Sequence, residues 1–178
     1  RLLSQGDSCG LHGYSPSLGI TSVREAVAAH LEERWGLPYR KEHIFMASGA
    51  AGALAHAFRL VARPGDEIVT FAPFFPEYRP YVELTGAVLR VVPPDRENFQ
   101  VDFDRFQEMI TEKTAAVLVN TPNNPSGVVY SEETLARLGE ILRESSARYG
   151  HTIYLISDEP YREIVFQGVD QPFVSSFY

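Results

Sequence analysis

Two polar loops follow apolar runs in the second half of the chain, and both carry side chains suited to binding or catalysis. The first, residues 120–127 (Asn-Thr-Pro-Asn-Asn-Pro-Ser-Gly), comes directly after the run 114–119. Its prolines and glycine exclude a helix and a strand, so the chain must leave the sheet there as a shaped loop. A cis peptide costs little only before proline, and Asn124-Pro125 is the candidate. Taken alone, this loop could also be an ordinary strand-to-helix turn.

The second loop, residues 157–161, places a carboxylate in an unusual position. Asp158 follows the apolar run 153–156. A carboxylate at the end of a buried strand is costly unless a partner stabilises it, which suggests a functional role. The alternative is that Asp158 caps the turn that follows.

Two further loops could complete a site. Residues 49–52 (Gly-Ala-Ala-Gly) open a predicted helix with small side chains, so backbone N–H groups and the helix dipole could bind an anion. Close packing of that helix on a strand is the alternative. Phe74 and Phe75 lie between two prolines. They cannot both face inward, so we expect one of them to line a cavity.

The elements that must position these residues alternate between strand and helix. Apolar runs predict five strands, at 44–47, 67–71, 87–92, 115–119 and 152–156. Such alternation predicts an α/β fold of three layers, with a mostly parallel sheet flanked by helices. Ligands bind beyond the carboxyl ends of parallel strands, and the four unusual loops all follow strands there. They are therefore expected to share one rim.

Capping signals predict where the helices begin. Ser22 with Glu25 predicts a capping box, and Gly36 ends that helix. Asp102 and Ser131 are predicted to cap two later helices. The residues expected to face inward are Val23, Val27, Leu31 and Trp35 on the first helix, and Leu54, Phe58, Val61, Phe103, Phe106, Ile110, Leu135, Leu138 and Leu142 on the later ones.

Length and composition limit the function classes. At 178 residues and 44% apolar residues, the chain has the size of one globular domain. A net charge of −7 and a pI near 5.2 argue against a nucleic-acid or anionic-membrane surface. No apolar run is long enough to span a bilayer, and the single Cys9 fits a reducing cytoplasm. The C-terminal stretch 173–178 has no helix stop or polar tail, so we expect a fragment of a longer protein.

The two polar loops resemble those of the class I/II aminotransferases, pyridoxal-phosphate enzymes of fold type I. The similarity is most specific at Asn124-Pro125-Ser126-Gly127 and Asp158-Glu159-x-Tyr161, and it extends from about Gly10 to Tyr161. It implies that residues 1–178 form part of a large cofactor-binding domain, with 1–20 as an N-terminal arm and a small domain outside the chain. It also implies a cytoplasmic homodimer that acts on amino acid and 2-oxo acid substrates.

The resemblance assigns catalytic roles to three residues around pyridoxal 5'-phosphate. Asp158 would keep the pyridine nitrogen protonated, which makes the ring an electron sink. Asn124 and Tyr161 would hydrogen-bond the phenolic oxygen of the cofactor and stabilise its phenolate form.

Five more residues are implied as cofactor contacts. Gly49, Ala50 and Ala51 would hold the phosphate, although many family members place a polar side chain at the position of Ala51. Phe75 would stack on the pyridine ring. Some members use Trp here, and Phe75 cannot donate a hydrogen bond as that indole does. Tyr14 would reach across a dimer interface to the phosphate of the neighbouring subunit.

The resemblance also requires a lysine that anchors the cofactor covalently. The chain has two lysines. Lys41 lies in the polar stretch before the first predicted strand, and Lys113 lies just before the fourth, at the opposite rim. Neither matches the family's Ser-x-x-Lys motif, so this lysine and the arginine that binds the substrate carboxylate are expected beyond Tyr178.

The leading interpretation is an aminotransferase of which this fragment alone is inactive. The same platform also serves carbon–sulfur lyases, cyclopropane-forming synthases and decarboxylases, so the resemblance determines the cofactor better than the reaction. A transcription regulator whose effector domain is a retired aminotransferase is another alternative. A nucleotide-binding domain of another kind is disfavoured, because the chain has no Gly-x-Gly-x-x-Gly or Gly-Lys-Ser/Thr element. We expect no metal in the site.

Overall fold

The structure is a computed structural model that describes residues 13–166 and 168–178. It divides into two compact units, residues 1–47 and residues 48–178. Cys9 and Gly10, which entered the sequence predictions, lie outside the described residues. No helix among the described residues is long and apolar enough to cross a membrane.

The first unit contains helix α2 (Thr21–Trp35) and the short 3-10 helix η2 (Lys41–His43). Gly36 ends α2 in the left-handed conformation (φ 68°), as predicted. The predicted capping box is wrong. The helix begins at Thr21, so Ser22 already lies inside its first turn, and no side chain caps the helix at Ile20.

The inner face of α2 also differs from the prediction. Val23 and Val27 are 41% and 36% exposed, whereas Arg24 and Ala28 are buried. The Arg24 guanidinium donates to the carbonyl oxygens of Ile44 (2.8 Å) and Lys41 (2.5 Å). These backbone acceptors satisfy the buried charge, so a polar residue occupies the face that the pattern assigned to valines.

The strand predicted at residues 44–47 is absent. Ile44 has an extended backbone, but no described strand pairs with the segment. Met46 N donates to the carbonyl oxygen of Leu18 (3.4 Å) and Ile44 N to that of Lys41 (3.2 Å), but neither acceptor lies in a strand. Phe45 and Met46 are exposed. An apolar run favours extended structure but cannot supply the neighbouring strand that a sheet requires.

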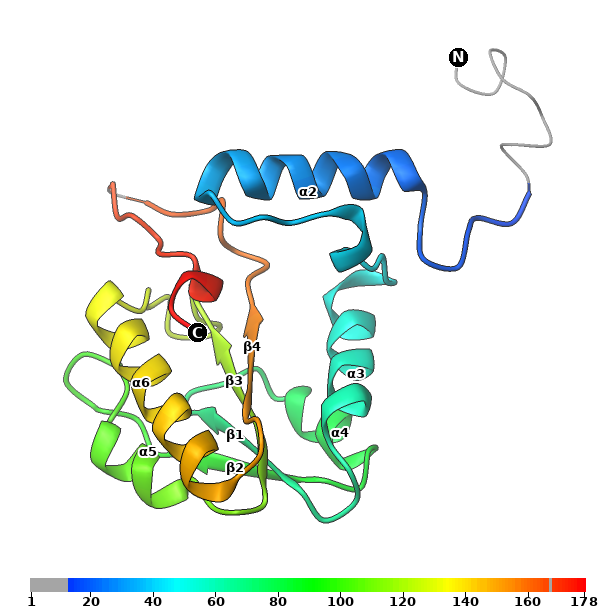
Figure 1. Ribbon diagram of the computed structural model, residues 1–178. Helices are drawn as coiled ribbons and strands as arrows, with labels where there is room; N and C mark the ends of the chain where they lie inside the picture. Colours follow the sequence, from blue (N-terminus) through cyan, green and yellow to red (C-terminus); the bar gives the residue numbers. More distant parts are fainter. Residues whose placement is uncertain (1–12, 167) are drawn as a thin grey trace. The chain divides into compact units, whose positions relative to one another are not determined.

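The second unit is built on a four-stranded parallel sheet (Figure 1). The strands are β1 (Glu67–Phe71), β2 (Val88–Val92), β3 (Thr114–Asn120) and β4 (Tyr154–Asp158), in the order β2-β1-β3-β4. All seven residues of β3 are buried, as expected for a central parallel strand. The α/β fold class is confirmed, with four strands among the described residues in place of the five predicted.

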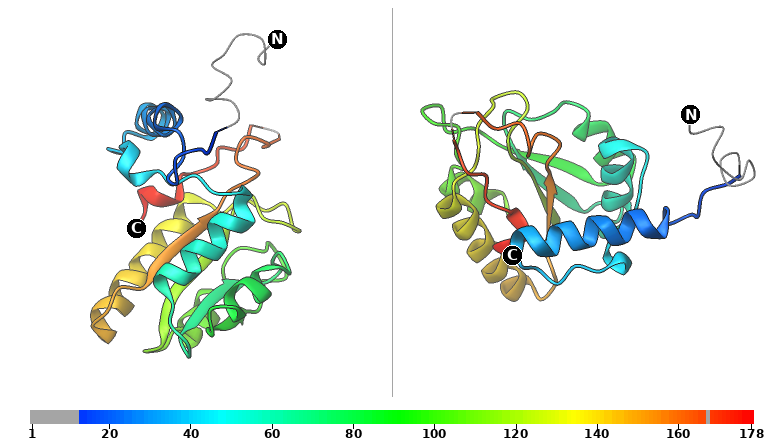
Figure 2. Two further views of the ribbon diagram at one scale, coloured as in Figure 1. Left: turned by 90° about the vertical axis from the view of Figure 1, so that its right-hand side faces the viewer. Right: turned by 90° about the horizontal axis from the view of Figure 1, so that it is seen from above.

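Helices cover both faces of this sheet (Figures 1 and 2). Helices α3 (Gly49–Val61) and α4 (Tyr78–Glu83) lie on one face, and α5 (Phe103–Met109) and α6 (Glu132–Tyr149) on the other. Each face has its own core. The first contains Leu54, Phe58, Ile68, Tyr78, Val82 and Leu118, and the second contains Val69, Phe106, Val117, Leu135, Leu138 and Leu142.

Two predicted helix caps are confirmed. The Asp102 side chain accepts a hydrogen bond from Arg105 N at the start of α5, and Ser131 accepts one from Thr134 N at the start of α6. A last 3-10 turn, η3 (Val174–Ser176), follows near the C-terminus. In register, Asn120 of β3 lies opposite Asp158 of β4, so the carboxyl ends of these strands are level.

Candidate active site

A cavity of about 240 Å³ lies at the carboxyl ends of β3 and β4. The start of α3, the segment around the start of α4, the loop after β3 and the turn after β4 all contribute to it. Its lining residues are Ala50, Ala51, Leu54, Phe75, Tyr78, Tyr81, Asn120, Asn124, Asp158, Pro160 and Tyr161. Among these described residues, Asp158 carries the one charged side chain.

Asn120 joins the loop after β3 to the end of β4. Its Nδ2 donates to the carbonyl oxygen of Asp158 (2.9 Å), and its Oδ1 accepts from Asn124 N (2.7 Å). The Asn120 side chain is buried, so both of its polar atoms need partners, and these two contacts provide them. Asn124 and Asp158 are thereby positioned through one buried amide.

Asn123 joins the same loop to the segment that precedes α4. Its Nδ2 donates to the carbonyl oxygen of Pro73 (3.2 Å), and its Oδ1 accepts from Ser126 N (3.0 Å) and Ser126 Oγ (2.7 Å). The Asn124-Pro125 bond is cis, as predicted. The bonds before Pro73 and Pro122 are cis as well. The side chains of Asn120 and Asn123 therefore hold the loop to the end of β4 and to the segment before α4.

Asp158 lies in the cavity wall, and among the described residues one side chain donates a hydrogen bond to its carboxylate. Tyr78 Oη donates to its Oδ2 at 2.5 Å. Burial raises the pKa of Asp158, and the Tyr78 hydrogen bond lowers it by less than burial raises it. Burial and the adjacent Asp158 both raise the pKa of Tyr78, so the phenol stays protonated and remains the donor.

The structure brings most of the predicted site residues together. Six of them line this cavity: Ala50, Ala51, Phe75, Asn124, Asp158 and Tyr161. Asn124 Nδ2 lies 3.4 Å from Tyr161 Oη, so the two predicted donors contact each other. Gly49 opens α3 beside Ala50 with a φ of 71°, which favours glycine. Tyr14 belongs to the first unit and is fully exposed.

The turn after β4 is held by a partly buried ion pair. Glu159 accepts from Ser157 Oγ (2.6 Å) and from Arg162 Nε (2.6 Å), and Arg162 Nη2 pairs with the same carboxylate. The Arg162 guanidinium also stacks over the Phe173 ring (4.9 Å). These contacts constrain the four-residue turn that carries Tyr161 into the cavity.

Sequence reasoning missed Tyr78, Tyr81 and Asn120. Tyr78 follows Phe75 by three residues, and a tyrosine at a buried helix start needs a partner for its hydroxyl. That spacing is the one signal that could have identified it. Asn120 directly follows the apolar run 115–119. A polar side chain at the end of a buried strand needs hydrogen-bond partners, and this could have indicated that Asn120 holds the loop in place.

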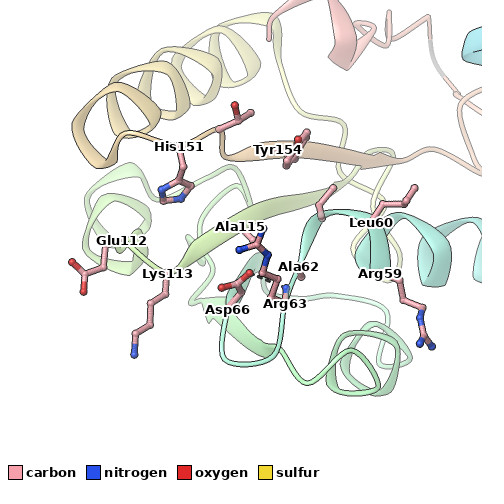
Figure 3. A pocket seen from close by; sticks show the side chains of 12 residues that line it. Arg59, Leu60, Ala62, Arg63, Asp66, Glu112, Lys113, Ala115, His151 and Tyr154 are labelled. Carbon is pink, nitrogen blue, oxygen red and sulfur yellow. Dashed lines mark hydrogen bonds between the residues drawn. The ribbon is translucent and has the colours of Figure 1, made fainter.

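A second cavity, of about 600 Å³, lies at the amino ends of the strands (Figure 3). Lys113, Arg63, Asp66, His151 and Tyr154 are among its lining residues. Figure 3 shows the Lys113 side chain directed away from the other labelled side chains. Lys113 directly precedes β3, so it lies at the amino ends of the strands, whereas Asp158 lies at the carboxyl end of β4. In the first unit, Lys41 pairs with Glu25 at 2.7 Å. Among the described residues, no group of His, Cys, Asp or Glu side chains gathers as metal ligands would.

A family model described as aminotransferase class I and II matches residues 2–176. The chain belongs to the class I and II aminotransferases. Similar relatives include a probable aspartate/prephenate aminotransferase of Thermus aquaticus, 37% identical over 94% of this chain and 42% of the relative. A methionine aminotransferase of Escherichia coli is 34% identical over 88% of this chain and 39% of the relative.

Solved aminotransferase structures share the fold. The crystal structure of an aminotransferase from Eubacterium rectale matches with a TM-score of 0.97 at 44% identity, covering 99% of this chain and 45% of that one. An aspartate aminotransferase from Thermotoga maritima matches with a TM-score of 0.88 at 31% identity, covering 99% of this chain and 44% of that one. The chain thus spans less than half the length of these aminotransferases. Members of the family use pyridoxal phosphate.

Proposed function

We propose that this chain forms the cofactor-binding part of a pyridoxal-phosphate-dependent aminotransferase, which transfers an amino group between an amino acid and a 2-oxo acid. The observation that carries the proposal is the position of Asp158, a half-buried carboxylate in a cavity whose other described lining residues carry no charge. The names of the similar relatives support amino transfer as the reaction.

The cavity fits pyridoxal phosphate by its chemistry. Burial raises the pKa of Asp158, so its ionised form is destabilised and lacks a cationic partner among the described lining residues. A protonated ring nitrogen would provide that partner. When bound, the cofactor supplies an electron sink, and Asp158 would hold the proton on which the sink depends.

Other residues of the chain would bind and orient the cofactor. Phe75, half-buried in the wall, offers a ring for stacking. Asn124 and Tyr161, in contact at 3.4 Å, would donate hydrogen bonds to one ring oxygen. The start of α3 presents backbone N–H groups at Gly49, Ala50 and Ala51 for a phosphate, since small side chains leave them accessible.

We further propose a cytoplasmic homodimer, with the anchoring lysine supplied outside this chain. Exposed Tyr14 supports the role of a residue that reaches a neighbouring subunit, and the single cysteine supports a reducing compartment. Neither lysine of this chain lines the cavity that contains Asp158, which supports a lysine from elsewhere in the protein.

The test is amino transfer by the full-length protein and its Asp158→Ala variant. Purified protein is incubated with individual amino acids and 2-oxoglutarate or pyruvate, and the new 2-oxo acid is measured by mass spectrometry. We expect Asp158→Ala to lower turnover by at least about 10²–10³-fold, the effect of removing one preorganised electrostatic group. Asp104→Ala, an exposed aspartate on α5, is the control and should leave turnover unchanged. Equal turnover by Asp158→Ala with bound cofactor would contradict the assignment.

A further inference from the structure

Tyr78 occupies an unusual position between the core and the cavity. It is the first residue of α4 and is fully buried, where its ring packs in the core with Phe58 and Val82. Its hydroxyl lies at the cavity wall and donates to Asp158 Oδ2 at 2.5 Å. The two residues lie 80 positions apart in sequence, so this bond connects α4 directly to the end of β4.

The same ring also contacts the stacking residue. Phe75 and Tyr78 meet edge to face, with centroids 5.7 Å apart and an interplanar angle of 77°. Phe74 stacks on Tyr78 from another direction, at 6.4 Å and 14°. The backbone reinforces the arrangement, because Tyr78 N donates to the carbonyl oxygen of Phe75 (3.1 Å). Edge-to-face contact with a fully buried ring restricts the plane that Phe75 can present to the cavity.

Few other titratable side chains line the cavity beside the Asp158 carboxylate. The titratable residues that line the cavity with it are Tyr78 and Tyr81 from α4 and Tyr161 from the turn after β4. The loop after β3 contributes the neutral amides of Asn120 and Asn124, and α3 contributes only apolar side chains. Within the described residues, the Tyr78 hydroxyl is therefore the direct hydrogen-bond donor to this carboxylate.

We propose that Tyr78 is the positioning residue of this site, orienting the Asp158 carboxylate through its hydroxyl and the plane of Phe75 through its ring. The inference rests on the proposed function for its catalytic meaning, but the two contacts themselves do not depend on it. One buried side chain thus fixes two cofactor-facing groups relative to each other.

The two halves of this role can be separated by substitution. Tyr78→Phe keeps the ring and removes the hydroxyl, so it affects Asp158 and spares Phe75. Tyr78→Leu removes both contacts. Tyr130→Phe is the matched control, because it deletes a hydroxyl from another buried tyrosine, which packs on Phe71 and does not line the cavity.

The first measurement is the pKa of Asp158 in the cofactor-free full-length protein, from ¹³C NMR of aspartate carboxyls, with the signal assigned by its loss in Asp158→Asn. A hydrogen bond to a charged group contributes enough that its removal should raise this pKa by about 1–2 units in Tyr78→Phe. Tyr130→Phe should leave it unchanged. An unchanged pKa in Tyr78→Phe overturns the proposal, whatever the protein binds.

The second measurement is the affinity for 4'-deoxypyridoxine 5'-phosphate, which lacks the aldehyde and so cannot react with a lysine. Tyr78→Phe should weaken binding by about tenfold, the equivalent of one lost charge-assisted hydrogen bond, and Tyr78→Leu by more. Equal affinity in the unsubstituted protein, Tyr78→Phe and Tyr78→Leu overturns the positioning role. If the unsubstituted protein does not bind this probe, the proposed function fails, and the pKa measurement still decides the Tyr78–Asp158 contact.

Discussion

Asp158, the proposed partner of the cofactor's ring nitrogen, occupies a position where burial disfavours its ionised form. Its carboxylate lies at the end of a strand, half-buried, and its one hydrogen-bonding side chain among the described residues is the neutral phenol of Tyr78. A neutral donor compensates only part of the hydration that an ionised carboxylate loses, which is why the pKa remains raised. We infer that the cofactor's charge compensates the rest.

The pH dependence of stability tests this account through Asp158→Asn. The folded-state pKa of Asp158 is raised, so the unfolded chain loses this proton first as pH rises. The contribution of Asp158 to the free energy of unfolding must then fall as pH rises from about 4, the usual aspartate pKa, through the folded-state value. Asparagine does not ionise and escapes this loss. We therefore expect the melting temperature of the cofactor-free Asp158→Asn variant to exceed that of the unsubstituted protein at pH 7 and to equal it near pH 3.

Thermal melts from pH 3 to 8 provide the measurement, and Asp104→Asn, at an exposed position, is the control. A variant that is less stable at pH 7 would show that Asp158 contributes to folding rather than opposing it. The expected pattern would also explain why the sequence marks Asp158 as a candidate site residue. A carboxylate after an apolar run is anomalous, and its anomaly has a physical cost.

Tyr78 could not be identified in the same way. Its sequence neighbourhood resembles an ordinary amphipathic helix start, and its partner is 80 residues away. Only the strand order and the register of β3 and β4 bring the hydroxyl to the carboxylate. Residue types and spacings indicate chemistry along the chain, whereas contacts across the sheet require the fold.

At the scale of elements, sequence signals succeeded where the determining contacts are local. Asp102 and Ser131 cap their helices through bonds to residues three positions on, which the sequence contains. The errors arose where the decisive partner is distant. Arg24 is buried because carbonyls of residues 41 and 44 accept its bonds, and residues 44–47 form no strand because none pairs with them.

Helix α6 provides an element-scale prediction at Gly139. An alanine methyl group there would lie 2.4 Å from the carbonyl oxygen of Phe177, which Arg143 Nη1 holds at 2.8 Å. Helix propensity alone favours alanine by about 1 kcal/mol, but the clash must displace the C-terminal segment. We expect Gly139→Ala to lower the free energy of unfolding by about 1–3 kcal/mol, as overpacking does.

Denaturant titration measures this change, and Ala147→Gly, at an exposed position of the same helix, is the matched control. It should lose up to about 1 kcal/mol through propensity alone. Glycine would then be the better residue at one position of α6 and alanine at the other. A gain in stability for Gly139→Ala would show that the C-terminal segment does not pack on α6.

At the scale of the whole molecule, the two ends of the sheet differ in chemistry. The carboxyl ends of β3 and β4 surround a small cavity with one acid, and the amino ends border a larger cavity with several charged residues (Figure 3). Both lysines lie outside the first cavity. β4 is one of the two edge strands among the described residues, and its Tyr154 is 48% exposed. We therefore expect this chain to provide non-covalent contacts for the cofactor, and covalent attachment at the cavity would need a lysine that these lining residues do not supply.

The last prediction follows from that division and concerns residues 1–178 alone. With pyridoxal 5'-phosphate, this chain should show weak, reversible binding by equilibrium dialysis, reduced in Asp158→Ala and unchanged in Asp104→Ala. Borohydride, which makes lysine adducts permanent, should yield no stoichiometric product, and the chain should not transaminate.

Lys41 should react slowly, because its ion pair with Glu25 raises its pKa and keeps the amine protonated. Peptide mapping after reduction identifies any labelled lysine. A stoichiometric adduct at Lys41 or Lys113, accompanied by turnover, would show that the chain contains its own anchoring lysine, whereas substoichiometric labelling without turnover is the surface reaction expected of any accessible amine.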